Sequence, residues 1–431
     1  MTNSTRQSTN ARTRRDQASL SFGILEQLES RVLLSTLTPA QIEQAYGINK
    51  ITFSANGQTI AGSGAGQTIA IVDAYADPNI ASDLATFDKA YGISNNDSKG
   101  NFALTIATPQ GTPTVNGGWS AEIALDVEWA HAIAPGAHIL LVEAKSSSLS
   151  DLLMAVNYAR SQSGVSTVSM SWGSSEFISE RLLDSYFLTP SGHNGVTFVA
   201  ASGDDGVTSW PATSPYVVAV GGTTLSLDSS GNYLGETAWS DSGGGYSFIE
   251  RTYAPDVAYD ANPSTGLSVY DSVAYNGVSG WETIGGTSAG APQWAALIAI
   301  ADQGRALQGL GSLTGTQTLS ALYSAPSADF HDITTGHNAY YYATPGYDPV
   351  TGRGTPVSNL LVSYLAGYST ATATAAVAVA PSPSPAPPHL RWGFGVARAS
   401  AVVAETFLSS PDDAVVAFAK GHRSLFSSSL V

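Results

Sequence analysis

Residues 66–92, which read GQTIAIVDAYADPNIASDLATFDKAYG, decide the fold class of this chain. The run from Gln67 to Tyr75 is almost continuously apolar, as is typical of a strand buried on both faces of a sheet. The residues at 81–92 carry apolar side chains at helical spacing and end at Gly92. A buried strand followed directly by a helix is the repeating unit of α/β proteins.

The same alternation of strands and helices continues along the chain. Further strands are predicted at 138–144, 165–173, 196–206 and 216–224, and helices at 120–134, 148–162, 178–187 and 288–307. We therefore expect an α/β fold with a parallel sheet covered by helices on both faces, and loops and short antiparallel strands over 225–283. Ligands of such sheets bind outside the carboxyl ends of the strands, where Asp73, Trp172 and Asp204 fall.

The charge balance restricts the class of partner. The 431 residues include 34 acidic and 18 basic side chains and no cysteine, and residues 36–365 alone carry 28 acidic and nine basic ones. A surface so acidic argues against nucleic acid as a partner, and it would lose much of its self-repulsion at low pH. The lack of cysteine excludes a disulfide framework. The chain has no run of 18 apolar residues, so no membrane span is predicted.

Composition divides the chain into four parts. Residues 1–36 are rich in Arg, Ser and Thr, and LEQLESRVLLS at 25–35 resembles a stretch near the N-termini of many exported proteins of some bacteria. We therefore expect a targeting segment and a secreted or cell-surface protein. Residues 37–368 are expected to form a globular domain, monomeric in solution. Residues 369–388 are a Pro/Ala/Ser linker, and 389–431 a tail of unknown role.

The predicted helix at 120–134 places two carboxylates on one turn. Glu122 and Asp126 are four residues apart, and a helical wheel puts both inside the apolar arc, while Ser120, Glu128 and His131 form the polar arc and are expected at the surface. Burying an ionised carboxylate is costly unless it is paired or shares a proton. The pair is therefore either a polar edge beside the core or a proton-sharing pair at a cleft.

The most specific stretch is GGTSAGAPQWAALIAIA at 285–301. Glycines allow a tight backbone approach, and Ser288 lies where a helix begins, so it is either a helix cap or a nucleophile at a helix N-terminus. A serine nucleophile needs a base. None of the seven histidines opens a helix from a glycine-rich turn, so the carboxylate pair is the alternative base.

Asp204, in ASGDDG at 201–206, follows a predicted strand. It is either a turn residue or a cleft acid. A protonated carboxyl group in a cleft can donate a hydrogen bond to an oxyanion, and burial is what keeps it protonated.

The motifs EIALD, SMSWG, SGDDG and GGTSAGAP, in this order and spacing, resemble the sedolisin family of serine-carboxyl peptidases over roughly residues 37–365. The resemblance implies a subtilisin-like, three-layer fold and hydrolysis of polypeptides at acid pH. It implies Glu122 as general base for Ser288, Asp126 as the residue that orients Glu122 and shares its proton, and Asp204 as the oxyanion donor. Asp73 and Trp172 are assigned to support of Glu122, with a loop acid and a packed aromatic as the alternative.

The same resemblance implies one calcium ion near the end of the domain. The loop at 331–356 is rich in Gly, Asp and Tyr, and carboxylates and backbone carbonyls are the ligands that calcium takes. The ligands implied are the carboxylates of Asp332 and Asp348 and the carbonyls of three further residues, namely Ile333, Thr344 and Gly346.

Two other functions compete with this interpretation. Sedolisins usually carry a long prosegment, whereas about 36 residues precede LTPAQIEQAYGI at 37–48, which favours an inactive or adhesive surface module on the same fold. The other is a histidine-dependent, subtilisin-type hydrolase that uses Asp73.

Overall fold

The computed structural model describes residues 36–369, 416–417 and 420–421. Nearly all of the segment 1–36, the linker 369–388 and most of the tail 389–431 thus lie outside the described residues. Everything below belongs to the compact unit Leu37–Val431. No helix of the described part has the length and apolarity needed to cross a bilayer.

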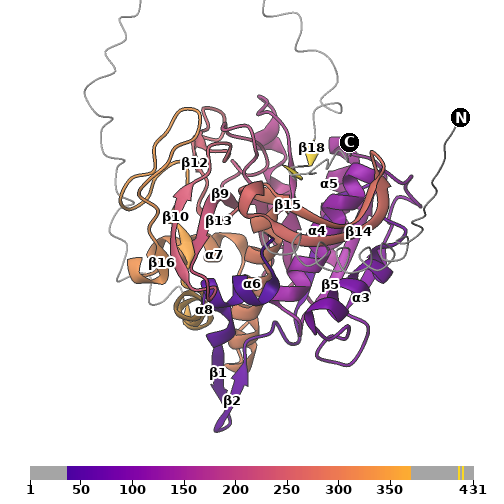
Figure 1. Cartoon of the computed structure of the whole chain (residues 1–431), viewed down its shortest axis with the longest axis horizontal. Coiled ribbons are helices and arrows are strands. Elements are labelled where there is room, and N and C mark those ends of the chain that lie inside the picture. The colour runs from indigo at the N-terminus through magenta and orange to yellow at the C-terminus, as the bar shows by residue number, and fades with distance from the viewer. Residues whose placement is uncertain (1–35, 370–415, 418–419, 422–431) are drawn as a thin grey trace, which may run out of the picture. The chain divides into compact units, whose positions relative to one another are not determined.

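A large, mostly parallel sheet lies at the centre of the domain (Figure 1). Seven of its eight strands run in the order β10-β9-β8-β6-β3-β5-β4, and β13 pairs with β9. Only the β10–β9 pair is antiparallel. The strands are β3 (Thr68–Ala74), β4 (Leu104–Ala107), β5 (His138–Ala144), β6 (Val165–Met170), β8 (Thr197–Ala201), β9 (Val217–Leu227), β10 (Tyr233–Ala238) and β13 (Val257–Asp260). The predicted α/β class is confirmed.

The sheet is buried on both faces, because alternate residues of each strand enter different cores. In β3, Ile69 and Ile71 join the core that contains α4 and α6, whereas Ala70 and Val72 join the core that contains α5. The long helices are α3 (Ile80–Tyr91), α4 (Gly117–Ile133), α5 (Leu149–Ser161), α6 (Gly290–Leu307), α7 (Gly315–Ser324) and α8 (Ser358–Gly367). Asp73 has the same parity as Ile71, so it lies on the α4 face.

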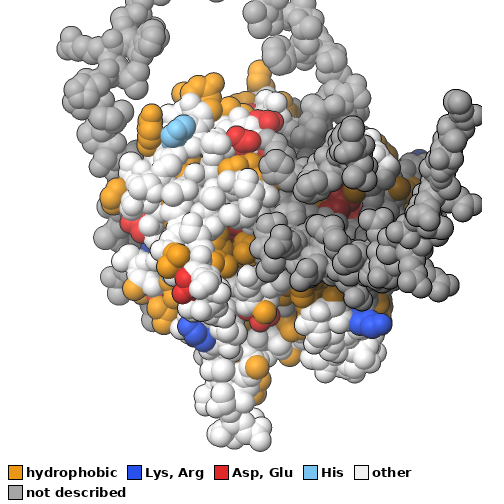
Figure 2. All heavy atoms as spheres, viewed as in Figure 1, with side chains coloured by type: hydrophobic (Ala, Val, Ile, Leu, Met, Phe, Trp, Pro, Cys, Tyr) orange, Lys and Arg blue, Asp and Glu red, His pale blue; other side chains and the backbone are white. Residues whose placement is uncertain are grey.

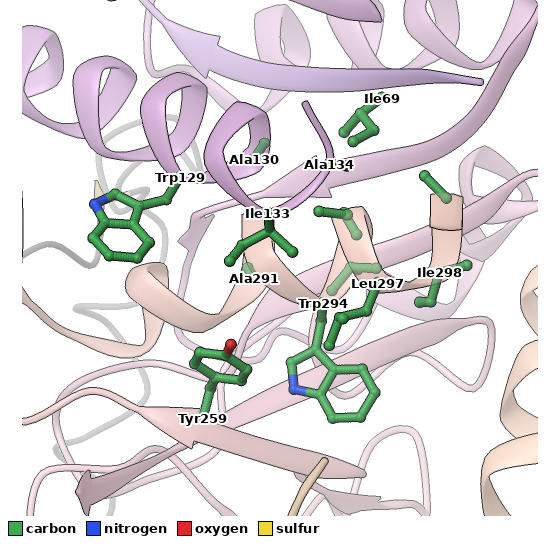
Figure 3. Packing of buried hydrophobic residues seen from close by; sticks show 14 of the residues in the cluster. Ile69, Trp129, Ala130, Ile133, Ala134, Tyr259, Ala291, Trp294, Leu297 and Ile298 are labelled. Atoms are coloured by element: carbon green, nitrogen blue, oxygen red, sulfur yellow. The ribbon is translucent and has the colours of Figure 1, made fainter. Parts of the chain in front are cut away.

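Helices α4 and α6 pack against each other over this face (Figure 3). Ile133 of α4 points toward α6, where Ala291 and Trp294 lie close by. The indole N–H of Trp294 donates to the carbonyl of Ala258 in β13 (3.0 Å), which fixes α6 to the sheet. This packing holds the N-terminus of α6, and therefore Ser288, beside the helix that carries Glu122 and Asp126.

The helix α4 is enclosed on all sides, which makes one prediction wrong. Ser120, Glu128 and His131 were expected at the surface, but all three are 0% exposed. Because α3, α6, β3 and the strand β14 (Leu267–Tyr275) all pack against α4, no face of it is left for solvent. His131 Nε2 lies 3.4 Å from Asp88 Oδ2 and 2.9 Å from the Ser94 carbonyl, and Glu128 accepts from the Tyr270 amide (3.0 Å).

The predicted helix at 178–187 is also wrong. The segment forms two short 3₁₀ helices, Glu180–Leu182 and Asp184–Phe187. Its apolar side chains do not share one buried face, since Ile178 and Leu182 are exposed while Phe187 is buried. The remaining 3₁₀ helices are Ile48–Lys50, Pro263–Thr265, Thr287–Ala289 (η5) and Ser327–Asp329.

Shorter elements complete the domain. They are α2 (Pro39–Ala45), β1 (Thr52–Ala55), β2 (Gln58–Ala61), β7 (Trp172–Gly173), β11 (Gly245–Tyr246), β12 (Tyr253–Ala254), β14 (Leu267–Tyr275), β15 (Val278–Gly285), β16 (Phe330–His331) and β17 (Thr355–Pro356). Two short strands of the tail also pair with the domain. β18 (Val416–Ala417) pairs with β7, and β19 (Lys420–Gly421) pairs with β15, both antiparallel (Figure 1).

The acidic excess lies mostly inside the protein, which corrects the expectation of a strongly acidic surface. Of the 28 acidic side chains in residues 36–365, 18 are buried. Uncharged atoms cover most of the described surface on the face that Figure 2 shows. Most acidic side chains of the domain therefore lie in its interior.

Candidate active site

Two glycine turns hold the candidate nucleophile and the candidate oxyanion acid. Gly286 has φ +106° directly after β15, and Gly203 has φ +107° two residues after β8. Side chains other than glycine rarely adopt this backbone region. The turns place Ser288 in η5, before α6, and Asp204 at the carboxyl end of the sheet.

Asp204 is bonded to the turn that carries Ser288. Its Oδ1 accepts from the backbone N of Thr287 (2.8 Å) and from Thr287 Oγ1 (2.9 Å), while Thr287 Oγ1 accepts from the amide of Gly203 (3.1 Å). Asp204 is 3% exposed and Ser288 is 0% exposed. The structure therefore brings the SGDDG and GGTSAGAP motifs together.

Ser171, in the SMSWG motif, connects Ser288 with the carboxylate helix. Ser288 Oγ donates to the backbone carbonyl of Ser171 (3.4 Å), and Ser171 Oγ donates to Asp126 Oδ1 (2.9 Å). Glu122 lies one turn before Asp126 on α4, is also 0% exposed, and raises the pKa of Asp126 by its charge. Four segments far apart in sequence thus meet at one end of the sheet.

A row of carboxyl groups extends from Asp126 across the sheet. Burial, the charge of Asp73 and the charge of Glu122 hold the pKa of Asp126 well above its usual value, against the opposing effect of the Ser171 hydroxyl. Burial and the charge of Glu143 raise the pKa of Asp73 to about 8. Asp73 and Glu143 are register partners on β3 and β5. Burial and like charge therefore favour the protonated forms of Asp73 and Asp126.

Trp172 supports the end of the strand and not a carboxylate. Its indole N–H donates to the backbone carbonyl of Val72 (2.9 Å), the residue before Asp73, and its ring is 0% exposed. This contact fixes the position of Asp73 relative to the SMSWG strand.

The loop expected to bind calcium brings its two predicted carboxylates to one short segment. Asp332 accepts from the amide of Gly346 through both carboxylate oxygens (3.1 and 2.9 Å), and Asp348 Oδ2 accepts from the amide of Thr344 (3.3 Å). These contacts run through backbone N–H groups, whereas the ligands that the resemblance implies are the carbonyls of the same two residues. Ile333, which completes the implied set, is buried.

Comparison with known proteins places this geometry in a family. The sequence model of the subtilase family matches residues 64–325. The chain belongs to the subtilase family. It is 34% identical to kumamolisin of Bacillus sp. (strain MN-32) over 379 residues, covering 76% of this chain and 63% of kumamolisin. It is 32% identical to sedolisin of Pseudomonas sp. (strain 101) over 263 residues, covering 50% of this chain and 43% of sedolisin.

A solved structure agrees with these relatives. The structure of Pseudomonas sedolisin (serine-carboxyl proteinase), complexed with two molecules of pseudo-iodotyrostatin, matches with a TM-score of 0.65 and 27% identity. The match covers 77% of this chain and 98% of that chain. The predicted recognition and the subtilisin-like fold are therefore confirmed, and this subtilase is sedolisin-like. The chain spans less than two thirds of the length of the curated relatives named above.

Three residues of the candidate site were missed by the sequence analysis. Ser171 and Thr287 lie inside quoted motifs and bond to candidate catalytic groups through a hydroxyl. Glu143 is the last residue but one of the strand HILLVEA, and its position near a strand end was the signal that could have identified it. None of the three could be assigned a partner without knowing the strand order.

The buried carboxyl groups predict that the domain is most stable in acid. Burial raises the pKa of Glu180 to about 8 and that of Asp256 to about 6, and burial with the charge of Glu143 raises that of Asp73 to about 8. Such groups stabilise the fold fully below about pH 4, and their contribution is lost as the pH rises through about 6 to 8. Thermal melts in chelator should show a melting temperature that falls from pH 4 to pH 8; a rising one would contradict the prediction.

Proposed function

We propose that this subtilase is a serine-carboxyl endopeptidase that hydrolyses polypeptides at acid pH. The observation that carries the proposal is the hydrogen-bonded connection from Ser288 through Ser171 to Asp126, together with the bond of Asp204 to Thr287. These bonds support a site that combines a hydroxyl, an acid pair and a third acid at the carboxyl end of a parallel sheet. The peptidase relatives support the same reaction class.

Each residue has a role in the proposed reaction. Ser288 attacks the peptide carbonyl while Glu122 takes the proton of its hydroxyl. Glu122 then gives this proton to the amine, which leaves as the C–N bond breaks and the acyl-enzyme forms. Asp126 shares that proton, which is favoured because two buried carboxylates cannot both ionise cheaply. Protonated Asp204 donates to the oxyanion. Water then hydrolyses the acyl-enzyme. Because Asp204 must be protonated while the Glu122–Asp126 pair accepts a proton, the reaction requires mildly acid pH.

Digestion of casein and of internally quenched peptides by the full chain, from pH 3 to pH 7, tests the function. We expect cleavage that is fastest in acid and that cuts within the peptide. A chain that binds peptides but cleaves none at any pH would support the inactive or adhesive surface module instead.

The contacts of the histidines argue against the histidine-dependent alternative. Among the described residues, His131, His138, His193 and His337 form hydrogen bonds with groups other than Ser288, and His331 stacks on Tyr233. Among the described residues, a carboxylate is therefore the proposed base.

Replacing Asp204 with alanine is expected to reduce turnover about 10²- to 10³-fold, as for loss of one oxyanion donor. Alanine removes the carboxyl group, whereas the amide N–H of an asparagine would still donate a hydrogen bond. The neighbouring Asp205→Ala is the matched control, because Asp205 is exposed and has no assigned role. The turnover of both variants is measured at the pH of fastest cleavage. Equal turnover of the two variants would show that Asp204 takes no part in the mechanism.

We propose that the loop at 331–356 binds one calcium ion through Asp332, Ile333, Thr344, Gly346 and Asp348. Both carboxylates face the same short segment, so an ion would join the two sides of the loop. Removal of calcium with chelator at pH 6 should lower the melting temperature by about 5 °C, the size expected for an ion at about a hundredfold its dissociation constant. Asp332→Asn should reduce this calcium dependence, and an unchanged dependence would contradict the site.

Polypeptides are the proposed partners, with no role for nucleic acid, and export from the cell is proposed from the segment at 25–35. Assay of culture supernatant against cell extract tests the location.

A further inference from the structure

A second group of carboxylates lies away from the loop proposed to bind calcium. Asp77 follows β3, Asp83 lies in the first turn of α3, and Asp271 lies on β14. Each offers one carboxylate oxygen, and these three oxygens lie within 4.8 Å of one another. The residues are 1%, 1% and 0% exposed. Two segments almost two hundred positions apart thus direct buried acids to one point.

Backbone contacts hold these carboxylates but leave oxygens unsatisfied. Asp77 Oδ1 accepts from the amide of Asn79 (2.8 Å), and Asp271 Oδ1 accepts from the amide of Val273 (2.7 Å). The Oδ2 atoms of Asp77 and Asp271 are buried and have no hydrogen-bond partner. Asp83 Oδ2 accepts from the amide and hydroxyl of Ser272 (2.9 and 3.0 Å). Buried polar atoms in folded proteins rarely stay unpartnered.

The surroundings add negative charge and supply no cation. None of the four ion pairs of the described residues includes a member of this group. Glu143 accepts from the amide of Asp77 (3.0 Å), and the charge of Glu282 acts on Asp271. Ionised carboxylates brought together inside a protein repel one another unless protons or a metal ion compensate them.

We propose that Asp77, Asp83 and Asp271 form a divalent-cation site that joins β14 to the start of α3. The donors are oxygen alone, so the site selects a hard ion such as calcium over zinc or copper. The unpartnered oxygens of Asp77 and Asp271 are the ligand positions that the fold leaves open. When the carboxylates ionise, the bound ion holds the loop that follows β3. It thereby also fixes the distance between Asp77 and Glu143.

Calcium titration of the full chain tests this site. The Ser288→Ala background prevents self-digestion, and calorimetry and metal analysis at pH 7.5 give the number of ions bound. The variant with Asp77→Asn and Asp271→Asn should bind one ion fewer than its parent. Asp332→Asn, in the other loop, should leave this ion bound. A double variant that binds as many calcium ions as its parent overturns the proposal, whatever the peptidase activity.

A second measurement separates loss of the site from failure to fold. In chelator at pH 7.5 the double variant should melt no lower than its parent, because asparagine removes the repulsion between the acids. Its gain in melting temperature on adding calcium should be smaller than the parent's. A double variant that melts lower in chelator and gains as much from calcium would show that the aspartates are structural and overturn the site.

The pairing of the tail carries a second inference. In β18, Val416 pairs with Gly173 and Ala417 with Trp172; in β19, Lys420 pairs with Gly285. Both edges adjoin the candidate nucleophile. The strand β7 directly follows Ser171, whose carbonyl accepts from Ser288, and β15 ends three residues before Ser288.

Extended peptides bind enzymes and adaptor domains by adding a strand to such an edge. We infer that the strands β18 and β19 compete with the extended substrate for the edges beside Ser288. This inference rests on the proposed peptidase function. The occupant is a segment of the same chain, so its effective concentration is high and independent of the enzyme concentration.

Proline at both positions of β18, in the variant with Val416→Pro and Ala417→Pro, tests the competition. Proline cannot donate to a strand edge, and Ala378→Pro in the linker is the matched control. We expect faster hydrogen exchange in a fragment that contains Trp172–Gly173, and a KM lower by about threefold or more. Unchanged exchange overturns the pairing, and faster exchange with an unchanged KM overturns the competition. A chain without any activity contradicts the proposed function, while exchange still reports on the pairing.

Discussion

Ser288→Ala is expected to reduce peptide hydrolysis by about 10⁴- to 10⁶-fold, as removal of a serine nucleophile does. The hydroxyl is the only part of the side chain that the variant loses. Ser288 is buried and its Oγ makes one weak hydrogen bond to the Ser171 carbonyl, so the fold should change little. Single-turnover kinetics with a labelled peptide measure the effect.

The control for this variant is Ser264→Ala, an exposed serine in a turn. Its turnover should equal that of the parent. A Ser288→Ala chain that keeps turnover within tenfold of the parent would exclude an acyl-enzyme on this residue, and with it the serine-carboxyl mechanism.

Glu122→Gln should cost about 10²- to 10⁴-fold in turnover, the range of general-base catalysis. Glutamine keeps the shape of glutamate but cannot take the proton of the Ser288 hydroxyl. The loss should appear in kcat rather than in KM, because the base acts as the hydroxyl attacks. A histidine-dependent hydrolase would be little affected by the same change.

Glu128→Gln is the matched control on the same helix. Glu128 is equally buried but accepts a hydrogen bond from the amide of Tyr270 and has no place in the proposed reaction. If both variants lose turnover equally, Glu122 acts by holding α4 in place and not as a base.

Local sequence patterns predicted most of the elements around the sheet. The strand at 138–144 has the predicted bounds, because its apolar run depends on near neighbours in the chain. The segment at 178–187 fails for the opposite reason, since Ile178 and Leu182 are exposed while Phe187 is buried, so its apolar side chains share no single buried face.

The environment of α4 could not be predicted from its own residues. A helical wheel assumes that one face of the helix is exposed to solvent. Every face of α4 is instead covered by α3, α6, β3 and β14, so His131 is buried beside Asp88. The carboxylate pair was visible in sequence because its spacing is local. The link from this pair to Ser288 runs through Ser171, and the position of Ser171 depends on the strand order. The hydrogen-bond partners of these residues and their catalytic roles therefore do not follow from the sequence alone.

The pairing of Asp73 with Glu143 has a consequence for how this chain can evolve or be engineered. The two acids lie opposite each other on adjacent parallel strands, and their side chains alternate with residues that face α5. Inserting or deleting one residue within β3 would turn Asp73 toward the opposite core and bring an apolar side chain into its place. Length changes are therefore tolerable between the strands, whereas within them only exchanges of one residue for another preserve the acid row.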